Sequence, residues 1–219
     1  MKKLFVWDFH GTLEKGNEFA ALDISNRALK KHGFPERFTE QQGNELYGKK
    51  WYEYFEYILP NEPHDVHVML QQTCFEWPEA EVIVAEYIQP NDHAAEVLRA
   101  IQAAGHSQIL ISNTSVEALP IFVAHAKLTD FFNAANSFAV MAHSKEVKRT
   151  KLDVLEEFIK AAAPHQSVIV IGDSPKDMDL AKHVKGVGYF YRHPGRELEF
   201  PKEKNIVQIT DLRKVLAEV

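Results

Sequence analysis

The segment that decides the fold is LFVWDFHGTL, residues 4–13. Its first four residues are apolar, and Asp8 follows them directly. Runs this apolar are typical of strands that are covered on both faces, as in a parallel sheet. Similar apolar runs, most of them ending in polar residues, recur at 108–113, 168–173, 187–192 and, more weakly, 206–209.

Helix-start signals lie between these strands in the second half of the chain. Thr150 with Asp153, and Ser174 followed by Pro175, are patterns that begin helices. Alternation of strands and helices predicts βαβ units with right-handed crossovers. The expected core is therefore α/β, with a Rossmann-like parallel sheet.

Residues 15–88 differ from the rest of the chain, because helical patterns follow one another there without a convincing strand. We interpret this stretch as an α-helical domain inserted between the first and second strands. The core would then comprise residues 1–14 and 89–219.

The composition is that of an ordinary globular protein, with 45% hydrophobic and 26% charged residues in 219. A net charge of −6 argues against general attachment to nucleic acid or an anionic membrane. The single cysteine, Cys74, excludes an internal disulfide. Asp8 interrupts the N-terminal apolar run too early for a signal peptide, and no stretch is apolar enough to span a membrane. We expect a cytoplasmic protein.

Polar residues follow three of the predicted strands, namely Asp8, Ser112 with Asn113, and Asp173. In an open parallel sheet, ligands bind beyond the carboxyl ends of the strands. Two carboxylates brought together there would repel each other, and a hard divalent cation relieves that repulsion. Mg²⁺ favours one or two carboxylates together with water and phosphate oxygens.

Four short motifs carry a resemblance to a known family. In chain order they are Asp8-Phe9-His10-Gly11-Thr12, Ser112-Asn113-Thr114, Lys148, and Gly172-Asp173-Ser174-Pro175-Lys176-Asp177. In type and order these resemble the motifs of the haloacid dehalogenase (HAD)-like hydrolase superfamily. The chain is similar to a phosphatase-type member with a helical, C1-type cap after the first motif. The resemblance covers nearly the whole length, and its first and fourth motifs are specific.

The resemblance implies a nucleophile and a metal site. Asp8 would attack phosphorus and form an acyl phosphate that water hydrolyses. Mg²⁺ would be bound by Asp8, by Asp173 and by the backbone carbonyl of His10. Asp177 would support the metal site, or it would only complete a helix cap with Ser174.

The resemblance also implies groups that bind phosphate. Ser112 and the N–H of Asn113 would hydrogen-bond the phosphoryl group. A lysine would neutralise the phosphate and hold the nucleophile. We favour Lys148, which precedes the Thr150 cap, over Lys151 one residue after it.

The residue two after the nucleophile departs from the pattern. Phosphatases of this family have an Asp there, which protonates the leaving alcohol and later activates water. This chain has His10. Three interpretations are open: imidazole does the same acid/base work, the enzyme is slow, or the chain binds a phosphorylated ligand without turnover.

The function that we expect is Mg²⁺-dependent hydrolysis of a phosphomonoester, with a small soluble phosphorylated metabolite as substrate. Dehalogenation, which uses the same nucleophile without a metal ion, is the rival within enzymes. The acids of the Gly-Asp-Ser-x-x-Asp motif argue against it, because they are suited to binding Mg²⁺. A non-catalytic phosphoryl-binding or regulatory protein is the alternative from another class. Elsewhere, His64 and His67 could share a metal ion, but we expect them on an exposed helix face because no third ligand motif is near.

Overall fold

The computed structural model describes residues 2–46, 49–140, 149–162, 165–193 and 203–219. Among these residues, six strands form one sheet in the order β5-β4-β1-β6-β7-β8, and every neighbouring pair is parallel. The predicted α/β class with a Rossmann-like parallel sheet is therefore confirmed. The strands are β1 (Leu4–Trp7), β4 (Ser107–Ser112), β5 (Ser137–Ala139), β6 (Val168–Gly172), β7 (Val187–Tyr191) and β8 (Ile206–Ile209).

The central position of β1 explains its sequence. Between β4 and β6 it has neighbours on both sides, and all four of its residues are buried. Side chains alternate between the two faces of a strand, so both faces must be apolar. Leu4 and Val6 belong to a core cluster on one face, together with Val154, Leu155, Val170, Leu180 and other residues.

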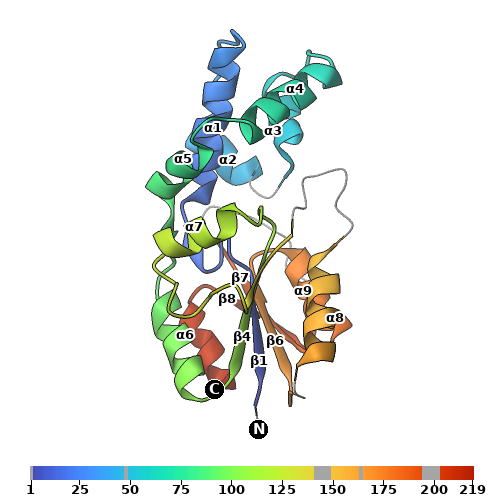
Figure 1. Ribbon diagram of the computed structural model, residues 1–219. Helices are drawn as coiled ribbons and strands as arrows, with labels where there is room; N and C mark the ends of the chain where they lie inside the picture. Colours follow the sequence, from blue (N-terminus) through green and yellow to red (C-terminus); the bar gives the residue numbers. More distant parts are fainter. Residues whose placement is uncertain (1, 47–48, 141–148, 163–164, 194–202) are drawn as a thin grey trace. The chain divides into compact units, whose positions relative to one another are not determined.

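Helices cover both faces of this sheet (Figure 1). Two of them, α8 (Lys151–Ala161) and α9 (Pro175–His183), lie on one face, and α6 (Ala94–Ala103) lies on the other with the C-terminal 3-10 helix η1 (Leu212–Glu218). Between β4 and β5, α7 (Ala118–His125) has Pro120 in its first turn, where no N–H is needed for the helix. Because α7 begins only two residues before Pro120, the helix does not bend at the proline.

The described chain divides into two compact units. One unit holds the sheet and takes the chain up to Lys15 and from Gln89 onward; the other is Gly16–Ile88. The short strands β2 (Glu14–Lys15) and β3 (Gln89–Pro90) pair antiparallel where the chain leaves the sheet unit and returns to it.

The unit Gly16–Ile88 is helical in its described part. Its helices are α1 (Asn17–Lys31), α2 (Glu40–Leu46), α3 (Trp51–Ile58), α4 (His64–Phe75) and α5 (Ala80–Tyr87). α3 packs on α4, while α1 packs on α2, α4 and α5. Within the stretch 15–88 predicted to be helical, the sequence did not mark Ala80–Tyr87 as a helix of its own. Its Glu79 cap has a left-handed conformation, which the sequence does not signal.

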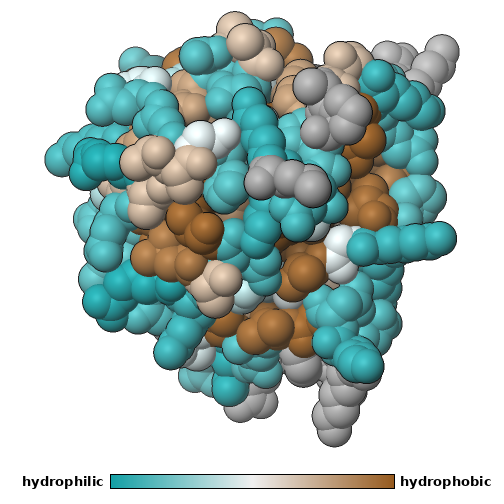
Figure 2. All heavy atoms as spheres, turned by 90° about the horizontal axis from the view of Figure 1, so that it is seen from below, coloured by the Kyte–Doolittle hydropathy of each residue, from teal (hydrophilic) through white to brown (hydrophobic). Residues whose placement is uncertain are grey.

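Seen from below the view of Figure 1, the surface is mostly hydrophilic, and its apolar side chains form several separate areas (Figure 2). None of the helices in the described part of the chain combines the length and apolar character needed to cross a bilayer.

Gly16, at the start of the helical unit, provides a test of this packing. It has φ of +106°, and an added Cβ would lie 2.1 Å from the carbonyl oxygen of Tyr87. Gly33 also has positive φ, +81°, but a Cβ there would meet nothing within 4 Å. We expect Gly33→Ala to cost roughly 1 kcal/mol of stability and Gly16→Ala at least about 2 kcal/mol more, measured by urea unfolding. Equal losses for the two variants would contradict the close approach at Gly16.

Candidate active site

The carboxyl ends of three neighbouring strands bring polar residues to one edge of the sheet. Asp8 follows β1, and its N–H donates to the carbonyl of Ile171 in β6 over 2.9 Å. Ser112 is the last residue of β4 on the other side of β1, and Asp173 follows β6 directly. Parallel strands all end at the same edge, so the topology alone gathers these residues.

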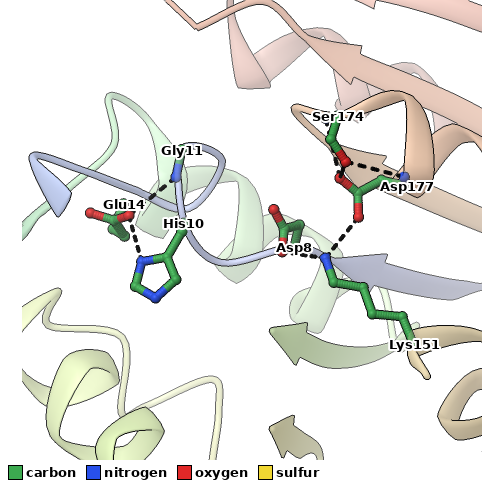
Figure 3. A network of polar contacts seen from close by, with 7 residues as sticks. All are labelled: Asp8, His10, Gly11, Glu14, Lys151, Ser174 and Asp177. Carbon is green, nitrogen blue, oxygen red and sulfur yellow. Dashed lines mark hydrogen bonds and ion pairs between the residues drawn. The ribbon is translucent and has the colours of Figure 1, made fainter. Parts of the chain in front are cut away.

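Lys151 connects this edge to the helices. It is the first residue of α8, directly after the Thr150 cap, and its Nζ lies 2.6 Å from Oδ1 of Asp8 and 2.8 Å from Oδ1 of Asp177 (Figure 3). The three side chains are only 12%, 10% and 2% exposed. Buried charges need partners, and here one ammonium serves two carboxylates.

Asp177 has two roles at once. Its Oδ2 accepts hydrogen bonds from Oγ of Ser174 at 2.5 Å and from the Ser174 N–H at 3.2 Å, which caps α9, while its Oδ1 contacts Lys151. The helix cap and the contact with Lys151 therefore use different oxygens of Asp177, while its support of a metal ion stays a prediction. A Cβ at Gly172 would lie 2.4 Å from Cβ of Asp177, so only glycine lets Asp177 approach the end of β6 this closely.

The charges at this edge shift the ionisation of two groups. Burial raises the pKa of Asp8 to about 7, the ammonium of Lys151 opposes the increase, and the carboxylates of Asp177 and Asp173 add to it. Burial lowers the pKa of Lys151, but the negative charges of Asp177 and Asp8 outweigh this and raise it above its usual value. Lys151 is therefore charged at neutral pH.

The three acids fit a magnesium ion. Asp8, Asp173 and Asp177 each offer a carboxylate oxygen, and these oxygens lie within 4.8 Å of one another. A set of oxygen donors without nitrogen or sulfur is the chemistry that Mg²⁺ prefers. A divalent cation at these oxygens would offset the mutual repulsion of the carboxylates, which adds to the burial that raises the pKa of Asp8. The hydrogen bond to Glu14 and the ring contacts of His10 are made by its side chain. Its backbone carbonyl therefore stays a predicted ligand of Mg²⁺.

Two buried hydroxyls near this edge have no hydrogen-bond partner among the described residues. They are Oγ of Ser112 and Oγ1 of Thr12, and both side chains belong to residues with no exposed surface. An unsatisfied buried hydroxyl is costly, and a phosphoryl oxygen would satisfy one of them. Asn113, the other predicted phosphate-binding residue, is exposed at the end of β4.

His10 is paired with a residue that the sequence had not pointed to. Oε1 of Glu14 lies 2.9 Å from Nδ1 of His10 and accepts the N–H of Gly11 over 3.1 Å (Figure 3). Glu14 has no exposed surface. Its spacing of four residues from His10 was a possible signal, but a glutamate in a turn is ordinarily solvated, and only the fold shows it buried.

Two aromatic rings also hold the ring of His10 in place. It lies edge-on to Phe9 and to Phe122 of α7, with ring centroids 5.1 and 5.7 Å apart. Because Oε1 of Glu14 already accepts one N–H, Nδ1 of His10 is the natural second donor to it. This leaves Nε2 as the ring nitrogen that can exchange a proton with a substrate.

The predicted lysine at position 148 lies outside the described residues, so the preference for Lys148 stays a prediction. Among the described residues it is Lys151, the alternative, that contacts Asp8 and Asp177. A lysine at the first position of a helix can reach back over the preceding turn, which sequence order alone does not reveal.

The fold and site define an α/β protein with a cluster of acidic residues at the carboxyl ends of its parallel strands. Residues 5–187 match the family model described as haloacid dehalogenase-like hydrolase. This chain therefore belongs to the haloacid dehalogenase-like hydrolase family, as the motifs predicted. A comparison with curated proteins gave no significant match.

Solved structures share the fold at low identity. A haloacid dehalogenase-like family hydrolase from Streptococcus pneumoniae is 16% identical with a TM-score of 0.72, covering 99% of this chain and 98% of its own. A protein from Haemophilus somnus described as a predicted phosphoglycolate phosphatase is 16% identical with a TM-score of 0.77, covering 99% and 97%. A subfamily IA hydrolase from Geobacter sulfurreducens is 15% identical with a TM-score of 0.70, covering 99% and 96%.

The raised pKa of Asp8 has a consequence for stability. Its shift from 3.8 to about 7 means that the folded protein holds this proton more tightly than the unfolded chain. The resulting stabilisation is complete below about pH 4 and is lost as the pH rises through about 7. In EDTA at about pH 8, we expect Asp8→Asn to raise the melting temperature by roughly 5 °C, with a smaller effect at about pH 5.

The control for this measurement is Asp179→Asn on the exposed side of α9, where Asp179 is 67% exposed and pairs with Lys182. We expect this variant to change the melting temperature little at either pH. A clear loss of stability for Asp8→Asn at about pH 8 would show that the ion pair with Lys151 outweighs the burial of the charge.

Proposed function

We propose that this protein is a Mg²⁺-dependent phosphomonoester hydrolase that acts on a small phosphorylated metabolite through an aspartyl phosphate on Asp8. The observation that carries the proposal is the contact of Lys151 Nζ with Asp8 and Asp177, at 2.6 and 2.8 Å, beside the carboxylate of Asp173. A candidate nucleophile, a positively charged lysine and a set of oxygen donors are thus gathered at one edge of the sheet. Membership of the hydrolase family supports the same reaction class.

In the first step, a carboxylate oxygen of Asp8 attacks phosphorus and the bond from phosphorus to the ester oxygen breaks. Lys151 holds the attacking carboxylate and offsets the charge that develops on the phosphoryl oxygens. Bound at Asp8, Asp173 and Asp177, Mg²⁺ would supply charge neutralisation and polarise the phosphoryl group. Oγ of Ser112, buried and unpaired in the described structure, would donate to a phosphoryl oxygen.

His10 provides the proton transfers, and Glu14 positions its ring. With Nδ1–H directed to Glu14, protonated His10 gives its Nε2 proton to the leaving alkoxide, and the alcohol departs. The neutral ring then takes a proton from the water that attacks the aspartyl phosphate. Inorganic phosphate leaves, and Asp8 and protonated His10 are restored. Glu14 fixes the ring and stabilises its positive charge, as an orienting carboxylate does for a catalytic histidine elsewhere.

The proposed substrate class rests mainly on the charges of the protein and of its candidate site. A net charge of −6 is unsuited to polyanionic macromolecules, whereas a local ammonium and a divalent cation suit one phosphate group. The fold is shared with a protein described as a predicted phosphoglycolate phosphatase, which is a small-metabolite activity.

The first experiment measures hydrolysis of p-nitrophenyl phosphate with Mg²⁺ and with EDTA. We expect turnover that requires Mg²⁺ and falls by at least about a thousandfold in Asp8→Asn, because the amide is not a nucleophile. Full activity in Asp8→Asn would remove Asp8 as the nucleophile. Mg²⁺-dependent binding of a phosphate analogue without turnover in the wild type would support the phosphoryl-binding alternative, for which His10 is the motivation.

The same assay compares Lys151→Met with Lys148→Met. Lys151→Met leaves the carboxylates of Asp8 and Asp177 without their shared cation, so we expect it to lose roughly a hundredfold or more in kcat. Lys148→Met tests the preference for Lys148, and a much smaller loss in this variant would assign the role to Lys151. The reverse order would assign the role to Lys148.

Substitution of Glu14 tests its role as the residue that positions His10. Glu14→Gln keeps the shape of the side chain and an acceptor for Gly11 N–H, but removes the charge beside the ring. We expect kcat to fall roughly ten- to a hundredfold with KM within about twofold. In the background of His10→Ala, the same substitution should change kcat little, because the two residues act as a unit.

Additive effects in this double-mutant cycle would mean that Glu14 has only a structural role. His10→Asp provides a further check, because it places a second carboxylate against the buried Glu14. We expect it to lower turnover, and a clear rise would show that His10 is only a weakened replacement for the usual aspartate.

A further inference from the structure

A second group of metal-binding side chains lies within the helical unit. Glu56 is in the last turn of α3, and His64 and His67 are in the first turn of α4, which packs on α3. The spacing of three residues puts the two histidines on one face of α4. Each of the three residues offers a ring nitrogen or a carboxylate oxygen, and these atoms lie within 4.8 Å of one another.

His67 is the residue that distinguishes this group from an ordinary surface cluster. It was expected on an exposed helix face, but it is only 4% exposed because α4 turns it toward α3. Its Nε2 lies 2.9 Å from the carbonyl oxygen of Leu59. A carbonyl only accepts hydrogen bonds, so Nε2 carries the hydrogen and Nδ1 carries a lone pair in the neutral ring.

Nδ1 of His67 is buried and has no hydrogen-bond partner among the described residues. A buried acceptor without a partner is costly and calls for an explanation such as an ion. The arrangement is also the one found at metal-binding histidines, where the second ring nitrogen donates to a backbone carbonyl and thereby fixes the tautomer and the ring orientation. His67 is thus prepared to bind a cation through Nδ1.

The other two residues complete the donor set and leave it accessible. Nδ1 of His64 lies 3.0 Å from Oε1 of Glu56, and the rings of His64 and His67 have centroids 6.4 Å apart. The side chains of His64 and Glu56 are 61% and 44% exposed, so an ion can enter from solvent and water can complete its coordination.

We propose that Glu56, His64 and His67 bind a divalent transition-metal ion of the Zn²⁺ type. Two imidazole nitrogens and one carboxylate oxygen, with water in the fourth position, are a coordination that Zn²⁺ accepts. The ion would join the end of α3 to the start of α4 and stabilise the helical unit. This site does not depend on the proposed hydrolase activity, and its donors differ from the oxygen-only set of Asp8, Asp173 and Asp177, which suits Mg²⁺.

The test is a titration of the tag-free full-length protein with ZnCl₂ in the presence of millimolar Mg²⁺, which competes for the oxygen-only site. We expect about one Zn²⁺ per chain by calorimetry and by metal analysis after dialysis, with a higher melting temperature when the ion is bound. Glu56→Gln and His64→Gln alter exposed side chains and should leave the fold intact, yet each should weaken Zn²⁺ binding at least about tenfold.

The matched control is His32→Gln, which removes an exposed histidine of the same unit that contacts Oγ1 of Thr73 and lies outside the cluster. It should bind Zn²⁺ as the wild type does. Absence of Zn²⁺ binding in the wild type at micromolar concentrations, unchanged affinity in both Glu56→Gln and His64→Gln, or an equal loss in His32→Gln would each overturn the proposal.

Discussion

The buried contact of one ammonium with two carboxylates is the interaction on which the candidate site depends. Asp8 comes from the end of β1, Asp177 from the first turn of α9 and Lys151 from the first turn of α8. Carboxylates brought this close repel one another, and burial strengthens the repulsion. Burial is the main cause of the raised pKa of Asp8; the ammonium of Lys151 opposes the increase, and the carboxylates of Asp177 and Asp173 add to it. The gathered carboxylate oxygens are what suits this edge of the sheet to a cation.

The pairing of His10 with Glu14 gives the departure from the family pattern a physical basis. A lone histidine in place of the usual aspartate would differ in charge and in reach. A histidine whose Nδ1 is held by a fully buried carboxylate has a defined ring orientation, so its other nitrogen can act as one specific acid and base. The same principle, a second ring nitrogen fixed by a neighbouring acceptor, applies to His67 in the helical unit.

Local patterns predicted much of the fold. The apolar runs located β1, β7 and β8 at the residues where the structure has them, and the Thr150 and Ser174 caps begin α8 and α9 as expected. β5 and α5 were missed for a local reason as well. β5 has only three residues, too few for the pattern of a strand to show, and α5 begins after a left-handed glutamate rather than a standard cap.

The sequence by itself determined the class of fold, the family and the acids at the ends of β1 and β6, because strand burial and cap chemistry act over a few neighbouring residues. Only the tertiary structure decided that Lys151 contacts Asp8, that Glu14 is buried against His10, and that Glu56 lies beside two histidines of the next helix. Each of these depends on side-chain direction and on solvent exclusion, and both are set by packing between elements. A residue's neighbours in the chain therefore do not reveal its charge partner.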